Sequence, residues 1–553
     1  MRRQILNPNK IYHNGKVITV DRNQSIQEAF SVADGKFLSV GSTRDILATA
    51  GPDTELIDLQ QKSVVPGLID GHCHLLSAST SEFNGEIPTP RDLAELTDWI
   101  SVQISQKQPG EWIVIDRIFP TRIKELRLLT LSELDAIAPD NPVFLNASFS
   151  GVVNSEALRI SNLYRNTSHP GVMTDKSSDR PTGVLHRSAF NLLVGLPQHT
   201  ATEDELYQAA REMFHRYNSV GITSATDVVP DQQTIDFYRK LLKAGDLSLR
   251  MCLDYRPKQP MNKTDTTRLA GLVDLKTGDG NEWLRMGPFK VMLDGGMLSG
   301  TACMRKPWGA RAAEIFGTDN PDDCGIINYT QDQLTEVVHT AHDLGWSFTA
   351  HTTGDGAVEL LLNAYAELHR ESPITEMRFS LLHANFLPPD QIRRCRKMGI
   401  LIDIQPIWFY KDADAMLDIL GSDRMRAFHT YNSILQSGLL MCAGSDHMVK
   451  LDPKDSINPF DPFFGMYAMI THKTEQETSI MPEEAISRID ALRAYTINNA
   501  FKSEEETIKG SIEKGKLADF AILDADFLQC PPEQFLDMPV AETVSGGNTV
   551  YVS

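Results

Sequence analysis

Val64-Val65-Pro66-Gly67-Leu68-Ile69-Asp70-Gly71-His72-Cys73-His74 is the most informative stretch of this chain. An apolar run passes through a Pro-Gly turn and then ends in two histidines one residue apart. Positions i and i+2 of an extended strand point to the same side, so His72 and His74 can hold one metal ion from the strand end. Two histidines that only cap a buried strand are the alternative. The apolar strand and the turn favour the metal site.

The overall composition narrows the function classes. A chain of 553 residues with 41% hydrophobic and 23% charged residues is typical of a soluble globular protein with one large domain and a smaller one, or with two to four ordinary domains. The net charge of −20 argues against a nucleic-acid partner, because phosphate backbones require clustered cations. It also mildly disfavours anionic membranes.

Targeting and redox signals favour the cytoplasm. The basic start of the chain is not followed by the apolar region of a secretory signal, and no stretch reaches the ~20 apolar residues of a membrane helix. The seven cysteines are scattered and never form a Cys-x-x-Cys pair. We therefore predict reduced thiols in a cytoplasmic protein, and we expect Cys73 to point away from the metal.

Both ends of the chain are rich in short strands and turns. Residues 10–20 and 29–41 each predict a hairpin, with Asn14-Gly15 and Asp34-Gly35 at the respective tips. At the other end of the chain, residues 510–524 alternate turn signals with a buried strand, and residues 544–552 predict one more strand around Gly546-Gly547. We therefore expect both termini to meet in one small β domain.

The middle of the chain alternates helical and strand patterns, which favours a parallel β/α architecture. Strands are predicted at residues 346–351, 378–383, 400–405 and 439–446, and helices at 331–344, 356–368 and 388–398. Residues from about 76 to 200 break this rhythm and predict an insertion.

Strand after strand in this region ends in a potential metal ligand. In a (β/α)₈ barrel the carboxyl ends of the strands surround one opening, where such side chains converge. A single histidine at a strand end is more often a hydrogen-bonded core residue, but the shared position of several such residues favours a site. The residues in question are His72, His74, Lys290, His351, His383 and Asp446.

This ordered set resembles the amidohydrolase superfamily of metal-dependent hydrolases, and more narrowly its amidohydrolase 3 (YtcJ-like) family. The resemblance covers nearly the whole chain. Its motifs are residues 66–74 and 444–446, which are specific to the superfamily, together with residues 152–158, 181–185, 221–224, 289–295, 351–355, 383–385 and 405–406. The resemblance implies a (β/α)₈ TIM-like barrel over residues 66–500, with the insertion at about 76–200. It also implies a small β-sandwich composed of residues 1–65 and 501–553.

The resemblance also implies roles for the ligand set. His72 and His74 would bind the more buried metal ion, and His351 and His383 the more exposed one. Asp446 would contact the buried ion and act as the general base. Lys290 corresponds to the lysine that is carboxylated by CO₂ in binuclear members, where it bridges two ions.

The residue types are consistent with this chemistry. Imidazole nitrogens and carboxylate oxygens suit one or two Zn²⁺ ions, with Fe, Mn or Co as substitutes. Such an ion makes hydroxide available at neutral pH, and Asp446 can take a proton and pass it to a leaving nitrogen. An unmodified Lys290 is a poor ligand because its ammonium group repels cations. Its alternative role is an ion pair with Asp294 or Asp446.

The insertion departs from the family pattern at three points. Phe149 precedes the Ser150 motif where relatives often have histidine, residues 112–119 lack a Gly-rich Trp-Asp segment, and His186-Arg187 stands where relatives often have glutamate. All three lie where the substrate pocket is expected, so a substrate cannot be transferred from a relative. Candidate pocket residues, each with an ordinary core or loop role as the alternative, are Asp116, Arg117, Trp308, Trp408, Tyr410 and His447.

The leading functional interpretation is hydrolysis of a C–N bond in a small-molecule amide by metal-activated hydroxide. Arg117 could bind a substrate carboxylate through two parallel hydrogen bonds, although a surface ion pair is its alternative. Esters, lactones or cyclic imides could be cleaved at the same site, because the fold does not fix the substrate. A metal-bound scaffold or sensor without turnover is the alternative from another class. The chain could also form a homodimer.

Overall fold

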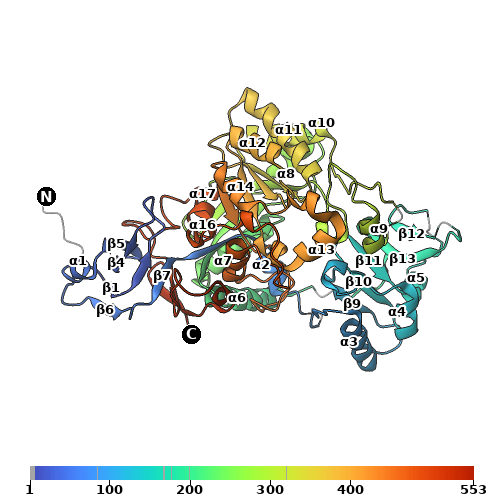
Figure 1. Cartoon of the computed structure of the whole chain (residues 1–553), viewed down its shortest axis with the longest axis horizontal. Helices are drawn as coiled ribbons and strands as arrows, with labels where there is room; N and C mark the ends of the chain where they lie inside the picture. The colour runs from blue at the N-terminus through green and yellow to red at the C-terminus, as the bar shows by residue number, and fades with distance from the viewer. Residues whose placement is uncertain (1–6, 84, 166–167, 176, 198–199, 319) are drawn as a thin grey trace.

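Eight apolar segments from the middle of the chain form the strands of one barrel. The computed structural model describes residues 7–553 apart from 84, 166–167, 176, 198–199 and 319, and the barrel lies at its centre (Figure 1). In sheet order the strands are β8 (Leu68–Cys73), β14 (Ile222–Val229), β15 (Arg250–Tyr255), β16 (Leu284–Met292), β17 (Phe348–Thr352), β18 (Ser380–His383), β19 (Leu401–Ile404) and β20 (Met441–Ala443). All adjacent pairs in this order are parallel. The predicted barrel is confirmed.

The barrel closes where the first and last strands meet, and we call this junction the β8–β20 seam. The amide of Asp446 donates to the carbonyl of His72 at 2.8 Å, and the amide of His74 donates to the carbonyl of His447 at 2.8 Å. The two backbones approach so closely that a Cβ atom on Gly444 would lie 2.4 Å from the amide nitrogen of His72. The seam therefore coincides with the two sequence motifs that carry candidate ligands.

The helices predicted from apolar periodicity are present with small shifts at their ends. The helix predicted at 331–344 is α10 (Gln331–Asp343), the one at 356–368 is α11 (Asp355–Glu371), and the one at 388–398 is α12 (Pro389–Met398). Helix α10 begins at a capping box in which Thr330 and Gln333 each bind the backbone of the other. Each helix buries an apolar stripe, which explains why the periodicity located it.

A composite β-sandwich lies beside the barrel, at the left of Figure 1. Its six-stranded sheet joins three C-terminal strands to three N-terminal ones, and a four-stranded sheet packs against it. In sheet order the strands are β23 (Asn548–Val552), β22 (Val540–Ser545), β21 (Phe520–Leu523), β7 (Ser63–Pro66), β2 (Lys16–Ile18) and β3 (Ile26–Gln27), facing β5 (Lys36–Gly41), β4 (Ala29–Ala33), β1 (Lys10–His13) and β6 (Glu55–Asp58). In the shared core the rings of Tyr12 and Phe30 stack, and both meet the ring of Phe520 edge to face.

One predicted hairpin is correct and the other is wrong. Strands β4 and β5 pair antiparallel around Asp34-Gly35, as expected. Residues 10–20 do not form a hairpin, because β1 pairs with β4 and β6 while β2 pairs with β3 and β7 in the other sheet. Asn14 adopts the left-handed φ of 58° that an Asn-Gly turn favours. The same turn chemistry serves here as a corner between two sheets, which lets both strands bury their apolar faces.

The predicted insertion carries a sheet of its own, at the right of Figure 1. Its strands, in sheet order, are β12 (Val172–Thr174), β13 (Pro181–His186), β11 (Ser150–Val153), β10 (Val143–Asn146) and β9 (Ile113–Asp116). Helices α3 (Leu93–Gln106) and α4 (Leu131–Ile137) share an apolar core with β9 and β10. The carboxyl ends of β9 and β10 face the barrel, because Arg117 and Ser148, which follow them, line one cavity together with barrel residues.

A buried ion pair joins the barrel to the sandwich. The Arg250 guanidinium, 2% exposed, donates to both carboxylate oxygens of Asp519 at 2.8 and 3.0 Å. It also lies over the Trp283 ring, 4.2 Å from its centroid. Arg250 begins β15, and Asp519 directly precedes β21, so this contact links one strand of each unit.

We expect Arg250→Met to destabilise the whole chain, because it leaves the Asp519 carboxylate buried without its cation. The expected loss is about 3–5 kcal/mol in the free energy of unfolding. It should appear as a lower melting temperature by calorimetry. Arg216→Met is the matched control, since Arg216 pairs with Glu212 on an exposed helix face and should matter little. Equal melting temperatures for the two variants would contradict the prediction.

Candidate metal centre and the cavity above it

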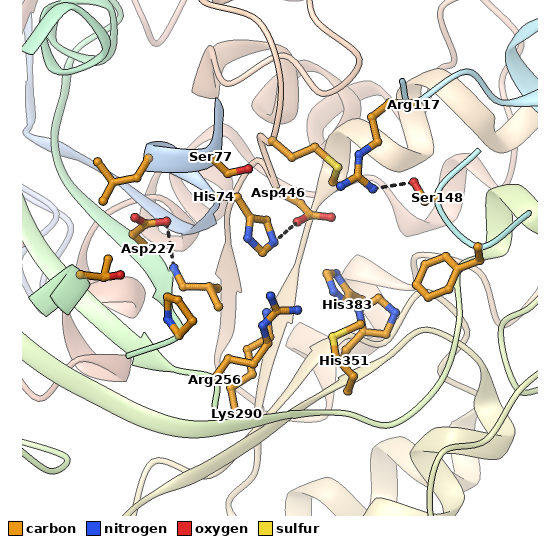
Figure 2. A pocket seen from close by; sticks show the side chains of 18 of the residues that line it. His74, Ser77, Arg117, Ser148, Asp227, Arg256, Lys290, His351, His383 and Asp446 are labelled. Carbon is orange, nitrogen blue, oxygen red and sulfur yellow. Dashed lines mark hydrogen bonds and ion pairs between the residues drawn. The ribbon is translucent and has the colours of Figure 1, made fainter. Parts of the chain in front are cut away.

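Three donor atoms converge at the carboxyl end of the seam. Nε2 of His72 and Nε2 of His74 lie 3.5 and 3.4 Å from Oδ1 of Asp446, and all three atoms lie within 4.8 Å of one another. Zinc bonds of about 2.0–2.2 Å place tetrahedral donors roughly 3.3–3.5 Å apart. The spacing and the donor types therefore fit one divalent ion. Figure 2 shows His74 and Asp446 facing each other at the cavity floor.

The local backbone explains why these side chains meet. His74 follows β8 directly and is the N-cap residue of α2 (Leu75–Ser79). Asp446 has a left-handed φ of 51°, an uncommon conformation for a residue other than glycine that concentrates at functional sites. Across the seam, the Asp70 carboxylate accepts from the amide and the hydroxyl of Ser445, at 2.9 and 2.5 Å. Hydrogen bonds between Asp70 and Ser445 thus hold the segment that carries His72 and His74 next to the segment that carries Asp446.

A second pair of histidines lies next to this cluster. The rings of His351 and His383 are 4.4 Å apart, and the His383 ring is 5.6 Å from that of His72. Nδ1 of His383 is 2.7 Å from Oε1 of Gln405. Because that oxygen can only accept, Nδ1 carries the hydrogen and Nε2 keeps its lone pair. Nε2 of His351 lies 3.1 Å from the Gly295 carbonyl, which leaves the lone pair on Nδ1 in the same way.

Lys290 lies buried beside the first pair. Its Nζ is 3.2 Å from Nε2 of His72, and the side chain is 1% exposed. In the part of the chain that the structure describes, no ion pair joins Lys290 to Asp294 or Asp446, so the alternative role for this lysine is not observed. Asp294 instead accepts from the backbone amides of Cys303, Thr353 and Gly354.

Burial sets the protonation of the cluster. It lowers the pKa of His72 and His351 well below the usual range and that of His383 to about 4, so these imidazoles are neutral and can donate a lone pair. Burial and the charge of Arg256 lower the pKa of Lys290 to about 7. Burial alone would raise the pKa of Asp446, but hydrogen bonds with His72 and His74 outweigh it and hold the pKa well below its usual range.

A cavity of about 770 Å³ opens above these groups. Barrel strand ends supply its floor, and one wall comes from the insertion. Residues lining it include His74, Arg117, Phe119, Ser148, Phe149, Asp227, Arg256, Lys290, Met297, His351, Thr353, His383, Asn385, Trp408, Asp446 and Met448. A cavity of this size suits a small molecule.

The sequence-predicted pocket residues divide into two groups. Arg117 and Trp408 line the cavity, whereas Asp116, Trp308, Tyr410 and His447 are not among the described residues that line it. The last four have structural contacts instead. Asp116 accepts from Asn146, Trp308 donates to the Ala302 carbonyl, Tyr410 packs against Phe464 and Tyr467, and the buried His447 ring bonds the Val449 and Lys450 carbonyls.

Several residues that line the cavity were not predicted, among them the polar residues Ser148, Arg256 and Asn385. Arg256 directly follows β15, so the rule that strand ends carry functional groups could have found it. Strand β15 was not predicted, because its buried residues include the charged Arg250 and Asp254. Ser148 lies at a loop of the insertion, where no periodic signal exists. Asn385 follows His383 by two residues, and its side chain bonds Nε2 of the buried His429 at 2.9 Å.

Comparison with known proteins finds similar proteins along nearly the whole chain. The amidohydrolase family model matches residues 55–551. N-substituted formamide deformylase from Arthrobacter pascens is 27% identical over 97% of this chain and 97% of its own length. YtcJ from Bacillus subtilis (strain 168) is 26% identical over 98% and 99%. The crystal structure of an uncharacterized metal-dependent hydrolase from Pyrococcus furiosus matches with a TM-score of 0.64 and 23% identity, over 94% of this chain and 100% of that one.

The barrel is shared with these relatives, and its donor cluster is of a kind that can hold a metal ion, as expected of a hydrolase of the amidohydrolase class. Since the family model covers almost the whole chain, the chain belongs to the amidohydrolase family. The resemblance inferred from the motifs is thereby confirmed. Among the described residues, no helix combines the length and apolar character that crossing a membrane requires.

We expect Gln405→Leu to weaken metal retention, because it removes the acceptor that fixes the hydrogen of His383 on Nδ1. Loss of such an outer contact typically costs 10- to 100-fold in metal affinity. The measurement is metal loss to a competing chelator. The control is Gln436→Leu, at an exposed position at the end of α14 (Tyr431–Gln436). The same rate of metal loss from both variants would count against this role for Gln405.

Proposed function

We propose that this chain hydrolyses the C–N bond of a small amide, such as an N-acyl or N-formyl amine, at a centre of one or two zinc ions. The observation that carries the proposal is the position of Asp446. Its carboxylate faces both His72 and His74 and also lines the cavity. A group placed this way can contact the ion and the reacting water together.

In this proposal His72, His74 and Asp446 hold the buried ion, and His351 and His383 hold the second. Neutral imidazoles with a carboxylate suit zinc best, with iron, manganese or cobalt as possible substitutes. A bound divalent ion supplies Lewis acidity and makes water a nucleophile at neutral pH. Asp446 then takes the proton released as water attacks the carbonyl carbon, and delivers it to the nitrogen as the C–N bond breaks.

Lys290 would link the two ions as a carbamate. Its buried Nζ lies 3.2 Å from Nε2 of His72 and has no carboxylate partner among the described ion pairs, so an ammonium group there is poorly compensated. The ammonium group first loses one proton to become a neutral amine. The amine then attacks CO₂, an N–C bond forms as one C=O π bond opens, and loss of a second proton leaves an anionic carbamate that can act as an oxygen donor. An oxygen donor suits the ions that the histidines would hold.

Metal analysis tests the carbamate. We expect close to two equivalents of metal in protein purified without chelator, and about one after Lys290→Met, measured by plasma mass spectrometry. Added bicarbonate should raise metal content in the unaltered chain and leave the variant unchanged. One equivalent in both proteins would remove the bridging role from Lys290. No metal in either, even after reconstitution, would overturn the proposed mechanism.

Asp446→Asn tests the general base. The amide keeps the size of the side chain but cannot accept the proton, so we expect turnover of a cleaved amide to fall about 10²- to 10⁴-fold with metal content largely retained. Asp423→Asn, at an exposed helix position, serves as the control. Unchanged turnover in D446N would exclude Asp446 as the base. A chain that binds amides without cleaving them would instead be a binding protein.

A further inference from the structure

Two guanidinium groups line the cavity of this acidic protein. Arg256 comes from the end of β15, next to Lys290, whereas Arg117 comes from the insertion. In Figure 2 the guanidinium of Arg117 points toward the space above Asp446, His351 and His383. The chain carries a net charge of −20, so its overall field does not attract anions. Recognition of an anion in this cavity requires local cations, and Arg117 is one that does not belong to the barrel floor.

The backbone around Arg117 is shaped to present it. Along β9 the side chains of Ile113 and Ile115 enter the core of the insertion. The chain then turns sharply, since Arg117 has a left-handed φ of 60°. Two residues after the end of the neighbouring parallel strand β10, Ser148 also has a left-handed φ, of 71°. Left-handed conformations cost free energy in non-glycine residues and mark sites whose surroundings enforce them.

These two turns bring their side chains together at the cavity wall. Nη1 of Arg117 donates to Oγ of Ser148 at 2.5 Å (Figure 2). Because this oxygen accepts from the guanidinium, its own hydrogen is available for another acceptor. A carboxylate at this wall can therefore receive hydrogen bonds from a guanidinium and from a hydroxyl. Charge-assisted bonds of this kind are about twice as strong as neutral ones.

The insertion is fixed to the barrel close to this pair. Five residues after Arg117, the Arg122 guanidinium donates to both carboxylate oxygens of Asp412 at 2.9 and 2.8 Å, and Asp412 is fully buried in α13 (Pro406–Met425). Arg122 also bonds Asn458, whose amide donates to the carbonyl of Asp446 at 2.8 Å. The Arg117 segment is thus held in register with the proposed base.

Three aromatic residues line the cavity together with this pair. They are Phe119, Phe149 and Trp408, and the Phe149 ring lies 6.2 Å from that of His351. Aromatic walls exclude water, which strengthens an ion pair formed beside them.

We infer that the amides cleaved here carry a carboxylate, which Arg117 binds together with Ser148 while the scissile carbonyl lies over the metal ligands. This inference rests on the proposed function and narrows its substrate class to carboxylated amides of the N-acyl amino acid type. Arg117 is the specificity-determining residue, and Ser148 positions it and adds a hydrogen bond.

Matched substrates test the charge requirement. N-formylglycine and N-isobutylformamide have nearly the same shape but differ in a carboxylate, as do N-acetylglycine and N-isobutylacetamide. We expect metal-loaded protein to show a higher kcat/KM for the acid of each pair. Arg117→Met should lower kcat/KM for the acids about 10- to 100-fold and change that for the neutral amides less than twofold. Arg117→Lys should recover part of the loss. Arg311→Met, on an exposed helix face, is the control.

The result that overturns the inference is a wild-type preference for the neutral amide, or an equal loss on both members of a pair after Arg117→Met. Calorimetric binding of N-formylglycine to D446N protein, with and without Arg117→Met, separates this inference from the proposed function. If no amide is cleaved by the wild type, the proposed function fails, and binding that depends on Arg117 still supports the carboxylate site. Binding that does not depend on Arg117 overturns it.

Discussion

The seam between the first and last barrel strands is the constraint on which the site depends. Asp70 from β8 accepts two hydrogen bonds from Ser445, and the backbones on either side exchange hydrogen bonds through His72, His74 and Asp446. Below them, Nδ2 of Asn499 in α17 (Ile497–Lys502) donates to carbonyls of both strands, at 2.7 and 2.8 Å. Each of these contacts crosses the seam. The contacts that close the barrel therefore also bring the candidate donor atoms together. A strand shifted along the seam would separate the donor atoms.

The hydrogen bonds across the seam are accompanied by buried charged groups, in a region where the core of a barrel is usually apolar. Asp403 on β19 is buried and ion-paired to Lys502, which also donates to the Gly71 carbonyl at 2.7 Å. Burial raises the pKa of Asp70 to about 7, so its carboxylate is held at a cost that its bonds to Ser445 and His72 only partly offset. Such a network stabilises one arrangement of the strand ends.

The sequence predicted the parts of the molecule whose signals are local. The barrel, its helices and the composite sandwich follow from periodicity and from the 66–74 and 444–446 motifs, and the ligand candidates follow from strand ends. The pocket residues were predicted less well. Trp308 and Tyr410 are buried by core packing, and His447 supports a loop, because an aromatic or histidine side chain satisfies a core as readily as a pocket. The hairpin predicted at residues 10–20 was wrong for a related reason. The Asn14-Gly15 pair predicts a turn, but it does not specify which strands pair on either side of it.

The division between barrel and insertion separates chemistry from recognition. The proposed ligands lie on strands that the seam fixes, whereas Arg117, Ser148 and Phe149 lie on turns of a separate sheet. The two parts meet through Arg122, Asp412 and Asn458, and the last of these bonds the backbone of Asp446 itself. Substitutions in the insertion can therefore change which acyl or amine group is accepted while the donor atoms stay in place. Loss of the Arg122 contacts would therefore affect both proposed functions, because the proposed substrate-binding wall and the loop that carries the proposed base are held by the same residue.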